Sequence, residues 1–286
     1  QVAHHGLAQH RVLLANGHQA LPFPARGPEV ARLAADGRTV VLRVLRHQWR
    51  ESAQGCAMTA IGKRGVVRRA FFCAHVAVAA GKEARNIELK PIMDKVGKLD
   101  LLVVSPDDPE AMLRHTEVAL SMGVAVAADP SQQMARMSGE EIKKLIAGAT
   151  YLFMNEYELA LAIQKTGWSD REILEQVKYR VVTLGSEGAR VESLTGKTIK
   201  VTCPKEKSKT DPTGVGDSFR SGFVAGLAWG LSHERCAQLG SMIATYVIET
   251  TGTQEYRFTS AEFLARFKEA YGASAAAEIE PHLPKL

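Results

Sequence analysis

The most constraining feature of this sequence is a regular alternation of short apolar runs with helical segments, which begins at about residue 83. LDLLVVS (99–105), VAVAADP (124–130) and TYLFMN (150–155) are typical of buried strands. A segment with helical periodicity follows each of them, as in chains whose helices connect parallel strands. We therefore predict an α/β fold with a mostly parallel sheet and helices on both of its faces.

The helical segments carry start and stop signals. Pro109 is expected in the first turn of one helix, and Gly123 is expected to close it. Ser138 is followed three residues later by a glutamate, which is the spacing of a capping box at a helix start. Gly167 is expected to end the next helix, and YRVVTLGSEGARVES (179–193) is interpreted as strand, glycine turn and strand. In sheets of this kind, ligands bind beyond the carboxyl ends of the strands.

Charge divides the chain at about residue 82. Residues 1–82 carry 12 Lys and Arg against 3 acidic residues, a net of +9, whereas residues 83–286 carry 24 against 28, a net of −4. The first part shows weak periodicity, with RTVVLRVLRHQWR (38–50) as its best strand or helix candidate. We therefore predict a poorly ordered basic N-terminal region over 1–82, an α/β domain over 83–272 and a loosely held tail over 273–286.

Several classes of protein fit the composition poorly. No run of the sequence approaches the ~20 apolar residues that a helix needs to span a bilayer, so no membrane contact is expected. Aromatic residues in the basic region are too scattered for a nucleic-acid stacking platform, and a solvated segment is the better interpretation. The four cysteines are widely spaced without a C-x-x-C pair, which favours a reducing, cytoplasmic compartment and predicts neither a zinc site nor a disulfide framework.

The stretch KTDPTGVGDSFRSGF (209–223) has features of a phosphate site. Apolar residues recur every four positions from Phe219, so a helix is predicted to start near Gly214 and Gly216. The start of a helix binds anions, and glycine lets a phosphate approach the backbone. A carboxylate beside such an anion, Asp217, is interpreted as a general base that accepts the proton of an attacking hydroxyl. Taken alone, an ordinary first-turn acid stabilised by the helix dipole is an equally good interpretation.

Motifs of other nucleotide-binding and hydrolytic proteins are absent. GKT (196–198) lacks the upstream glycine of a P-loop, and no G-x-G-x-x-G follows a predicted strand. LGSEG (184–188) differs from the G-x-S-x-G of serine hydrolases. These absences argue against a P-loop, a dinucleotide-binding fold and a hydrolase elbow.

DPTGVGDSF (211–219) resembles the C-terminal signature of the ribokinase-like (PfkB) family of sugar and nucleoside kinases. The resemblance covers about residues 83–258, including DPSQQMAR (129–136), NEYE (155–158) and TLGSEG (183–188), and in this detail it is similar to adenosine kinases of the bacterial, actinobacterial type. It implies a ribokinase-like fold and a Mg²⁺-dependent transfer of the γ-phosphoryl group of ATP to a nucleoside 5′-hydroxyl, adenosine first. A sugar kinase of the same family and a non-catalytic nucleotide-binding relic stay open as alternatives.

The resemblance also implies roles for individual residues in the transfer. Asp217 looks like the catalytic base of the family, beside the acceptor hydroxyl, and the anion hole for the γ-phosphate would be the backbone of Gly214, Val215 and Gly216. Asn155 and Glu158 match the motif that holds Mg²⁺ and its waters, which prefers oxygen ligands. Without the family, Asn155 would be interpreted as a helix cap and Glu158 as a solvated acid.

Further residues are implied in binding ATP and nucleoside. The implied ATP site comprises Thr183, Gly185, Gly188, Asp211, Thr213 and Gly252. The implied nucleoside site comprises Gln132, Gln133, Arg136 and Asp217. Arg136 is also a candidate to offset phosphate charge, and a monovalent cation near Asp211 is left open, as is a homodimer. Read without the family, the turn in TLGSEG is only a hairpin.

The N-terminal third departs from the family pattern. Family members begin with a strand whose acidic residue binds sugar hydroxyls, followed by a Gly-Gly motif with a nearby Asn and by a small β-sheet lid. Residues 1–82 show none of these features. We therefore expect the family's lid to be missing or disrupted, and the phosphate machinery to be more complete than the nucleoside pocket.

Overall fold

The computed structural model describes residues 12–15, 56–61, 67–72, 84–96 and 98–283. The strand or helix candidate RTVVLRVLRHQWR and most of the basic N-terminal region lie outside the described residues. The poorly ordered region predicted over 1–82 therefore stays a prediction.

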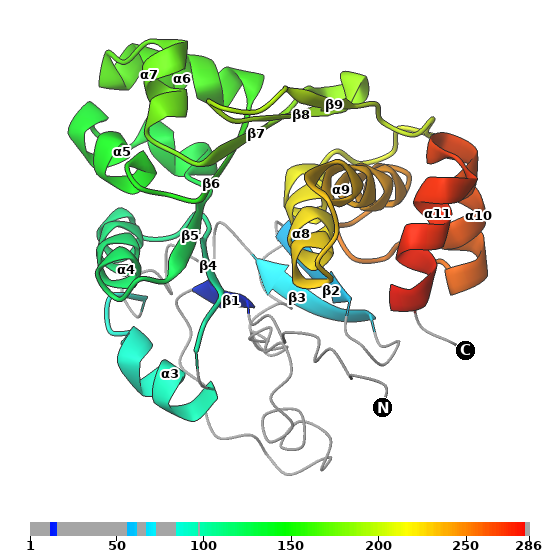
Figure 1. Ribbon diagram of the computed structural model, residues 1–286, viewed down its shortest axis with the longest axis horizontal. Helices are drawn as coiled ribbons and strands as arrows, with labels where there is room; N and C mark the ends of the chain where they lie inside the picture. The colour runs from blue at the N-terminus through cyan, green and yellow to red at the C-terminus, as the bar shows by residue number, and fades with distance from the viewer. Residues whose placement is uncertain (1–11, 16–55, 62–66, 73–83, 97, 284–286) are drawn as a thin grey trace, which may run out of the picture.

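A seven-stranded sheet forms the centre of the described chain (Figure 1). Its strands are β1 (Val12–Ala15), β4 (Leu101–Val104), β5 (Ala125–Ala128), β6 (Tyr151–Asn155), β7 (Tyr179–Thr183), β8 (Ala189–Glu192) and β9 (Ile199–Val201), in that spatial order. The pairs from β1 to β7 are parallel, whereas β8 and β9 add antiparallel pairs. The predicted mostly parallel sheet is confirmed, and its strands are up to three residues shorter than the apolar runs.

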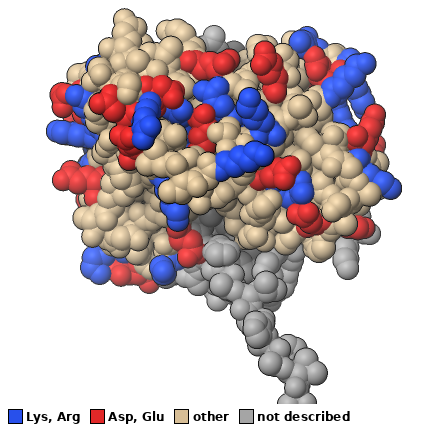
Figure 2. Space-filling view, turned by 45° about the horizontal axis from the view of Figure 1, so that its top comes forward, with Lys and Arg blue, Asp and Glu red and all other residues tan. Residues whose placement is uncertain are grey.

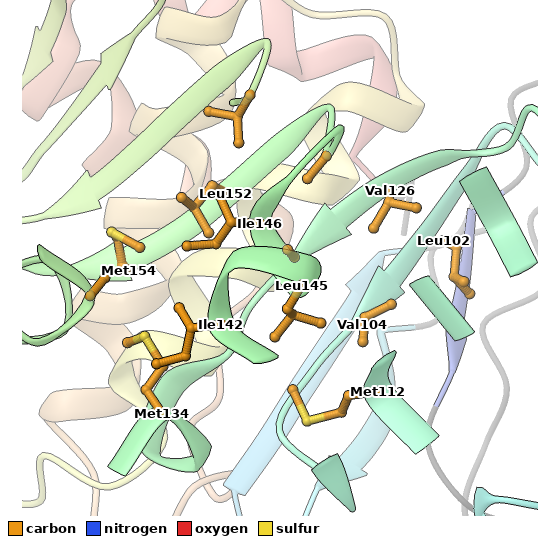
Figure 3. Packing of buried hydrophobic residues seen from close by; sticks show 14 of the residues in the cluster. Leu102, Val104, Met112, Val126, Met134, Ile142, Leu145, Ile146, Leu152 and Met154 are labelled. Carbon is orange, nitrogen blue, oxygen red and sulfur yellow. The ribbon is translucent and has the colours of Figure 1, made fainter. Parts of the chain in front are cut away.

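Helices cover both faces of this sheet (Figure 1). One layer contains α3 (Leu89–Val96), α4 (Pro109–Ser121), α5 (Gly139–Ile146), α6 (Glu156–Thr166) and α7 (Asp170–Glu175), and the other contains α8 (Val215–Ala228) and α9 (His233–Ile248). Because side chains alternate along a strand, Leu102 and Val104 pack towards the first layer while Leu101 and Val103 pack towards the second. Figure 3 shows Met112 of α4 and Leu145 of α5 on the first of these faces.

The predicted helix signals are confirmed. Pro109 lies in the first turn of α4, and Gly123 follows the end of that helix with a left-handed φ of +69°. Ser138 caps α5 and forms a capping box with Glu141. Gly167 ends α6 with a φ of +72°, a conformation that favours glycine because it has no Cβ.

Helices α8 and α9 approach each other through glycine. A Cβ on Gly222 would lie 2.7 Å from the Cα of Gly240, and a Cβ on Gly226 would lie 2.9 Å from the Sγ of Cys236. The neighbouring Phe219 and Phe223 are buried against the sheet. The side of α8 that carries Gly222 and Gly226 therefore contacts α9, and backbone atoms make part of this contact.

Residues 273–282 form helical structure, whereas a loosely held tail was predicted over 273–286, of which the last three residues lie outside the described part of the chain. Helix α10 (Ser260–Tyr271) is followed by α11 (Ala273–Ile279) and a short 3-10 turn (Glu280–His282). Ile279 is fully buried in a cluster with Phe263 and Phe267 of α10. The prediction was wrong because alanine, which made the stretch look featureless, is the best helix former and because its packing partners lie outside the stretch.

A buried arginine lies on β7, the strand at which the pairing in the sheet changes from parallel to antiparallel. The side chain of Arg180, on β7, is 1% exposed. Its Nε donates to Oε2 of Glu192 on β8 at 2.8 Å, and its Nη1 lies 3.0 Å from Oδ1 of Asp170 at the start of α7. Arg180 therefore links three elements, β7, β8 and α7.

Strands β2 (Cys56–Ile61) and β3 (Val67–Phe72) form an antiparallel ribbon, and β2 lies beside α8 (Figure 1).

Among the residues described, no helix has both the length and the apolar character to cross a membrane. On the face drawn in Figure 2, Lys and Arg are interspersed with Asp and Glu rather than gathered in a patch of one sign.

Candidate active site

A cavity of about 210 Å³ lies at the carboxyl ends of the parallel strands. Pro106 follows β4, Asp129 follows β5, and Thr183 ends β7. The end of β6 and the start of α6 contribute Asn155 and Glu158. The first turns of α8 complete the described part of the lining, so the cavity collects residues from the ends of four neighbouring strands and from the starts of two helices, α6 and α8.

The start of α8 offers open space for an anion. Gly214 precedes the helix with a φ of +80° and provides no side-chain cap. A Cβ on Gly216 would meet no atom within 4 Å, so packing does not require glycine at this position. The backbone there can be approached closely from the cavity, and the positive end of the helix dipole favours negative charge. Val215 begins the helix and packs into the core instead of lining the cavity.

Asp217, in the first turn of α8, faces the cavity with a side chain that is 17% exposed. Its Oδ1 accepts a hydrogen bond from Nη2 of Arg220, one turn further along the helix. Nη1 of the same arginine pairs with Oδ2 of Asp129 at the end of β5. Sequence reasoning assigned no role to Arg220 or to Asp129. The available signal was an arginine in the middle of a helix whose neighbouring residues are small or apolar.

Asn155 and Glu158 form a capping box at the start of α6. Oδ1 of Asn155 accepts from the backbone N of Glu158 at 2.8 Å, and Oε2 of Glu158 accepts from the backbone N of Asn155 at 2.8 Å. The cap interpretation of Asn155 is therefore confirmed, but Glu158 is not a solvated acid. Burial raises the pKa of Glu158 above its usual value, as expected for a carboxyl group in a cavity.

The cavity contains no complete metal cage within the described residues, where no group of three or more His, Cys, Asp or Glu could hold an ion. Magnesium in phosphoryl-transfer sites keeps several waters and uses one or two carboxylates together with phosphate oxygens. Asn155 and Glu158 supply one carboxylate and one amide on the cavity wall. They therefore fit an ion held mainly by phosphates and water.

The segment proposed to bind nucleoside is the 3-10 turn η1 (Ser131–Ala135). Ser131 has a φ of +44°, the one positive φ of a non-glycine residue in the described chain, and strain of this kind clusters at functional sites. Gln132 lines the cavity and is exposed. Gln133 is buried outside the lining, and Arg136 is exposed outside it. The structure thus brings one of these three residues to the described cavity wall.

Lys165, near the end of α6, holds the far end of η1. Its Nζ donates to the backbone oxygens of Met134, Ala135 and Met137, each at 2.8 Å. An ammonium group has three protons, so these contacts use all of its donor capacity. Sequence reasoning gave Lys165 no role, because no local motif indicates this contact between distant segments.

The glycine-containing turn proposed for ATP follows the end of β7. Thr183 lines the cavity, and the hairpin between β7 and β8 that follows it contains Gly185 and Gly188, with φ of +60° and +99°. A Cβ on Gly188 would lie 1.9 Å from the backbone oxygen of Val201, so this glycine is required by its contact with β9. Neither glycine lies on the described lining.

Asp211 joins the segment before α8 to the segment after α9. Its Oδ1 accepts from the backbone N of Thr213 at 2.9 Å, and its Oδ2 accepts from the backbone N of Gly252 at 3.0 Å. The hydrogen bonds from Thr213, with that from Gly252, lower the pKa of Asp211. These three residues lie outside the described lining, and the observed part of Asp211 is to fix the loop that leads into Gly214.

Comparisons with known proteins place this site in a wider context. The sequence profile described as pfkB family carbohydrate kinase matches residues 73–259. A nucleoside kinase of Methanocaldococcus jannaschii is 32% identical over 155 residues, covering 54% of this chain and 51% of that protein. A cytidine kinase of Thermococcus kodakarensis is 26% identical over 169 residues, covering 57% and 60%. The chain spans about half the length of the curated nucleoside kinases it matches.

Solved structures give a similar result. The nucleoside kinase of Burkholderia thailandensis in complex with inosine is 28% identical and superposes with a TM-score of 0.62, covering 86% of this chain and 78% of that one. The same kinase in complex with ADP-inosine gives the same identity and TM-score. The adenosine kinase of Sinorhizobium meliloti, at 21% identity and a TM-score of 0.52, is similar in fold alone.

Proposed function

Since this chain belongs to the pfkB family of carbohydrate kinases and has the ribokinase-like α/β fold, we propose that it transfers the γ-phosphoryl group of ATP to the 5′-hydroxyl of a nucleoside. One observation carries the proposal: the carboxylate of Asp217 lies on a cavity wall one residue from Gly216, where the backbone is open to an anion. A base beside a phosphate site is the arrangement that hydroxyl phosphorylation needs.

The protein groups act in three ways in this proposal. The start of α8 binds the γ-phosphate and stabilises the charge on its oxygens during transfer. Asp217 accepts the proton of the acceptor hydroxyl as the oxygen–phosphorus bond forms and the bond to ADP breaks. Asn155 and Glu158 would hold a hydrated Mg²⁺, which would offset the charge of the phosphates. Residues of the parallel strand ends keep these groups in fixed relative positions.

Nucleosides are the acceptor class that the relatives support best. The curated relatives include nucleoside kinases and a cytidine kinase, and the Burkholderia thailandensis nucleoside kinase has been solved in complex with inosine and with ADP-inosine. Adenosine is our first candidate, on the strength of the DPSQQMAR motif, whose Gln132 lies on the cavity wall with amide donors and acceptors suited to a base. A sugar hydroxyl is the alternative acceptor, because the family also contains carbohydrate kinases. A monovalent cation near Asp211, a homodimer and a cytoplasmic location stay predictions.

The test is single-turnover phosphate transfer with Asp217→Asn, alongside ATP binding. The substitution keeps the shape and the helix start but removes the proton acceptor. Loss of a general base lowers the rate by about 10²–10⁴-fold, and we expect a decrease of this size with the ATP dissociation constant unchanged or slightly lower. Asp94→Asn is the matched control, because Asp94 is an exposed acid on α3 whose partner is Lys90.

The acceptor panel contains adenosine, inosine, cytidine, ribose and myo-inositol. Transfer to adenosine or another nucleoside supports the proposal, whereas preferential transfer to a sugar or to inositol would replace it with the carbohydrate kinase alternative. ATP binding without transfer to any acceptor would favour the non-catalytic relic. An Asp217→Asn rate within about threefold of the parent, far less than a base contributes, would show that the proton leaves by another route.

A further inference from the structure

Arg220 occupies a position that is unfavourable for a cation. Its side chain is 6% exposed, so its charge is held almost completely away from water. Removing a charged group from water costs several kcal/mol unless it is paired and hydrogen-bonded. Asp217 and Asp129, which contact two different nitrogens of its guanidinium, supply that pairing. The position of Arg220 therefore depends on these two carboxylates.

The contacts connect Asp217 to the rigid sheet. Asp217 and Arg220 are three residues apart and share one side of α8, so the helix brings them together. Asp129 directly follows β5, and its backbone N donates to the oxygen of Val104 on β4 at 2.9 Å. The planar guanidinium presents its N–H groups in a fixed fork, so bonding to Asp129 determines the direction from which it meets Asp217.

The charges around the cavity make Arg220 distinctive. Among described residues, the titratable or charged groups on the wall are Asp129 from the end of β5, Glu158 from α6, and Asp217 and Arg220 from α8. Three carboxyl groups therefore face one cation. Without that cation, repulsion among the carboxylates would favour the protonated form of Asp217, which cannot act as a base.

We propose that Arg220 is a positioning residue that orients the carboxylate of Asp217 and keeps it ionised, with Asp129 anchoring Arg220 to the sheet. The inference rests on the proposed function, because orientation matters for proton transfer. Oδ1 of Asp217 accepts the bond from Arg220, and in the proposed reaction the same carboxylate receives the proton of the acceptor hydroxyl. When that proton arrives, Asp217 becomes neutral and Arg220 stays paired with Asp129, so no unpaired charge is created.

The experiment compares Arg220→Gln, Arg220→Lys and Arg180→Gln in the full chain. Arg180 is a matched control, because it is a similarly buried arginine between two carboxylates but lies outside the described cavity lining. The first readout is the carboxyl ¹³C NMR titration of Asp217, assigned by its loss in Asp217→Asn, which requires no activity. The second readout is the pH dependence of kcat, and the third is the unfolding midpoint in urea.

Arg220→Gln should raise the titration midpoint of Asp217 by about 1–3 pH units, the usual effect of an adjacent arginine on an aspartate. It should lower kcat at neutral pH by about 10²-fold, the loss expected from a misplaced catalytic group, and leave the KM for ATP within threefold. Arg220→Lys keeps the positive charge but lacks the planar, forked arrangement of N–H groups. In this variant the titration midpoint of Asp217 should stay near the parent value while kcat falls. Arg180→Gln should lower stability without moving the midpoint or kcat.

Two outcomes would overturn the inference. One is an Asp217 midpoint in Arg220→Gln that equals that of the parent while stability falls as in Arg180→Gln, since Arg220 would then be structural only. If Arg220→Gln does not fold, Arg220→Lys decides, and a parent-like kcat in that variant would overturn the positioning role. Unchanged transfer in Asp217→Asn instead rejects the proposed function, so the two failures are distinguishable.

Discussion

Replacing Gly216 with alanine should separate the stability of the fold from the binding of phosphate. The backbone φ of Gly216 is not in the left-handed region, and a Cβ there would meet no atom within 4 Å. A Gly→Ala change at a compatible position stabilises a protein by about 0.4–1 kcal/mol, because the unfolded chain loses freedom. For a chain of this size, such a gain corresponds to a rise of about 1–4 °C in Tm.

The same methyl group should impair function, because it occupies the space through which we expect a phosphate to reach the start of α8. A steric conflict of about 1–3 kcal/mol corresponds to a decrease in ATP affinity of about 5–150-fold. Isothermal titration with ATP, single-turnover transfer and thermal unfolding measure the three quantities on one preparation. We expect a higher Tm together with weaker ATP binding and slower transfer.

Gly222→Ala is the matched control, and it is expected to change the stability of the fold in the opposite direction. It lies on the same helix, and its Cβ would lie 2.7 Å from the Cα of Gly240, on backbone that cannot rotate away. Overpacking of about 1–3 kcal/mol or more should exceed the helix-propensity gain of about 1 kcal/mol, so this variant should lose stability. A Gly216→Ala variant that is destabilised, or one that binds ATP within twofold of the parent, would refute the assignment of an open phosphate site.

Three other substitutions test the site and its support. Glu158→Gln keeps an acceptor for the capping box and should raise the Mg²⁺ concentration needed for half-maximal transfer several-fold; an unchanged requirement would leave Glu158 a capping residue only. Lys165→Met removes three bonds to the segment of Gln132 and should raise the nucleoside KM about tenfold, the effect of about 1.4 kcal/mol, with the KM for ATP unchanged; equal effects on both would contradict a local role. Burial, with the charge of Lys178, lowers the pKa of His233, so the folded chain binds fewer protons than the unfolded chain as pH falls below about 6.5. His233 thus contributes stability above that pH, and this contribution is lost as the pH falls through the lowered pKa of the folded state. The free energy of unfolding in urea should therefore differ less between pH 5 and pH 7.5 for His233→Gln than for the parent.

Much of the fold could be predicted from the sequence because its signals are local. The strands are continuous apolar runs, and residues such as Ser138 and Gly167 specify helix ends through bonds and backbone angles within a few positions. The small face of α8 was also visible in Gly222 and Gly226, since close helix contacts require small side chains. These features need no knowledge of what lies elsewhere in the chain.

The parts of the site that were missed depend on contacts between distant segments. Asp129 and Arg220 meet only when the start of α8 docks against the end of β5, so the apolar neighbours of Arg220 can indicate its burial but not its partner. The bonds of Lys165 to three carbonyl oxygens and the positive φ of Ser131 have no sequence signature either. Predicting them requires the packing of α6 on the turn after β5, which the spacing of apolar residues does not specify.

The glycine contact between α8 and α9 has a consequence for how ligands are received. At Gly222 the two helices touch through backbone atoms, so sliding or rotation at this point would bring backbone against backbone. The start of α8 is therefore preorganised, and its loss of conformational entropy occurs during folding rather than during binding. We therefore expect that the start of α8 stays fixed when a nucleotide binds, and that any closure of the site comes from other elements moving towards it.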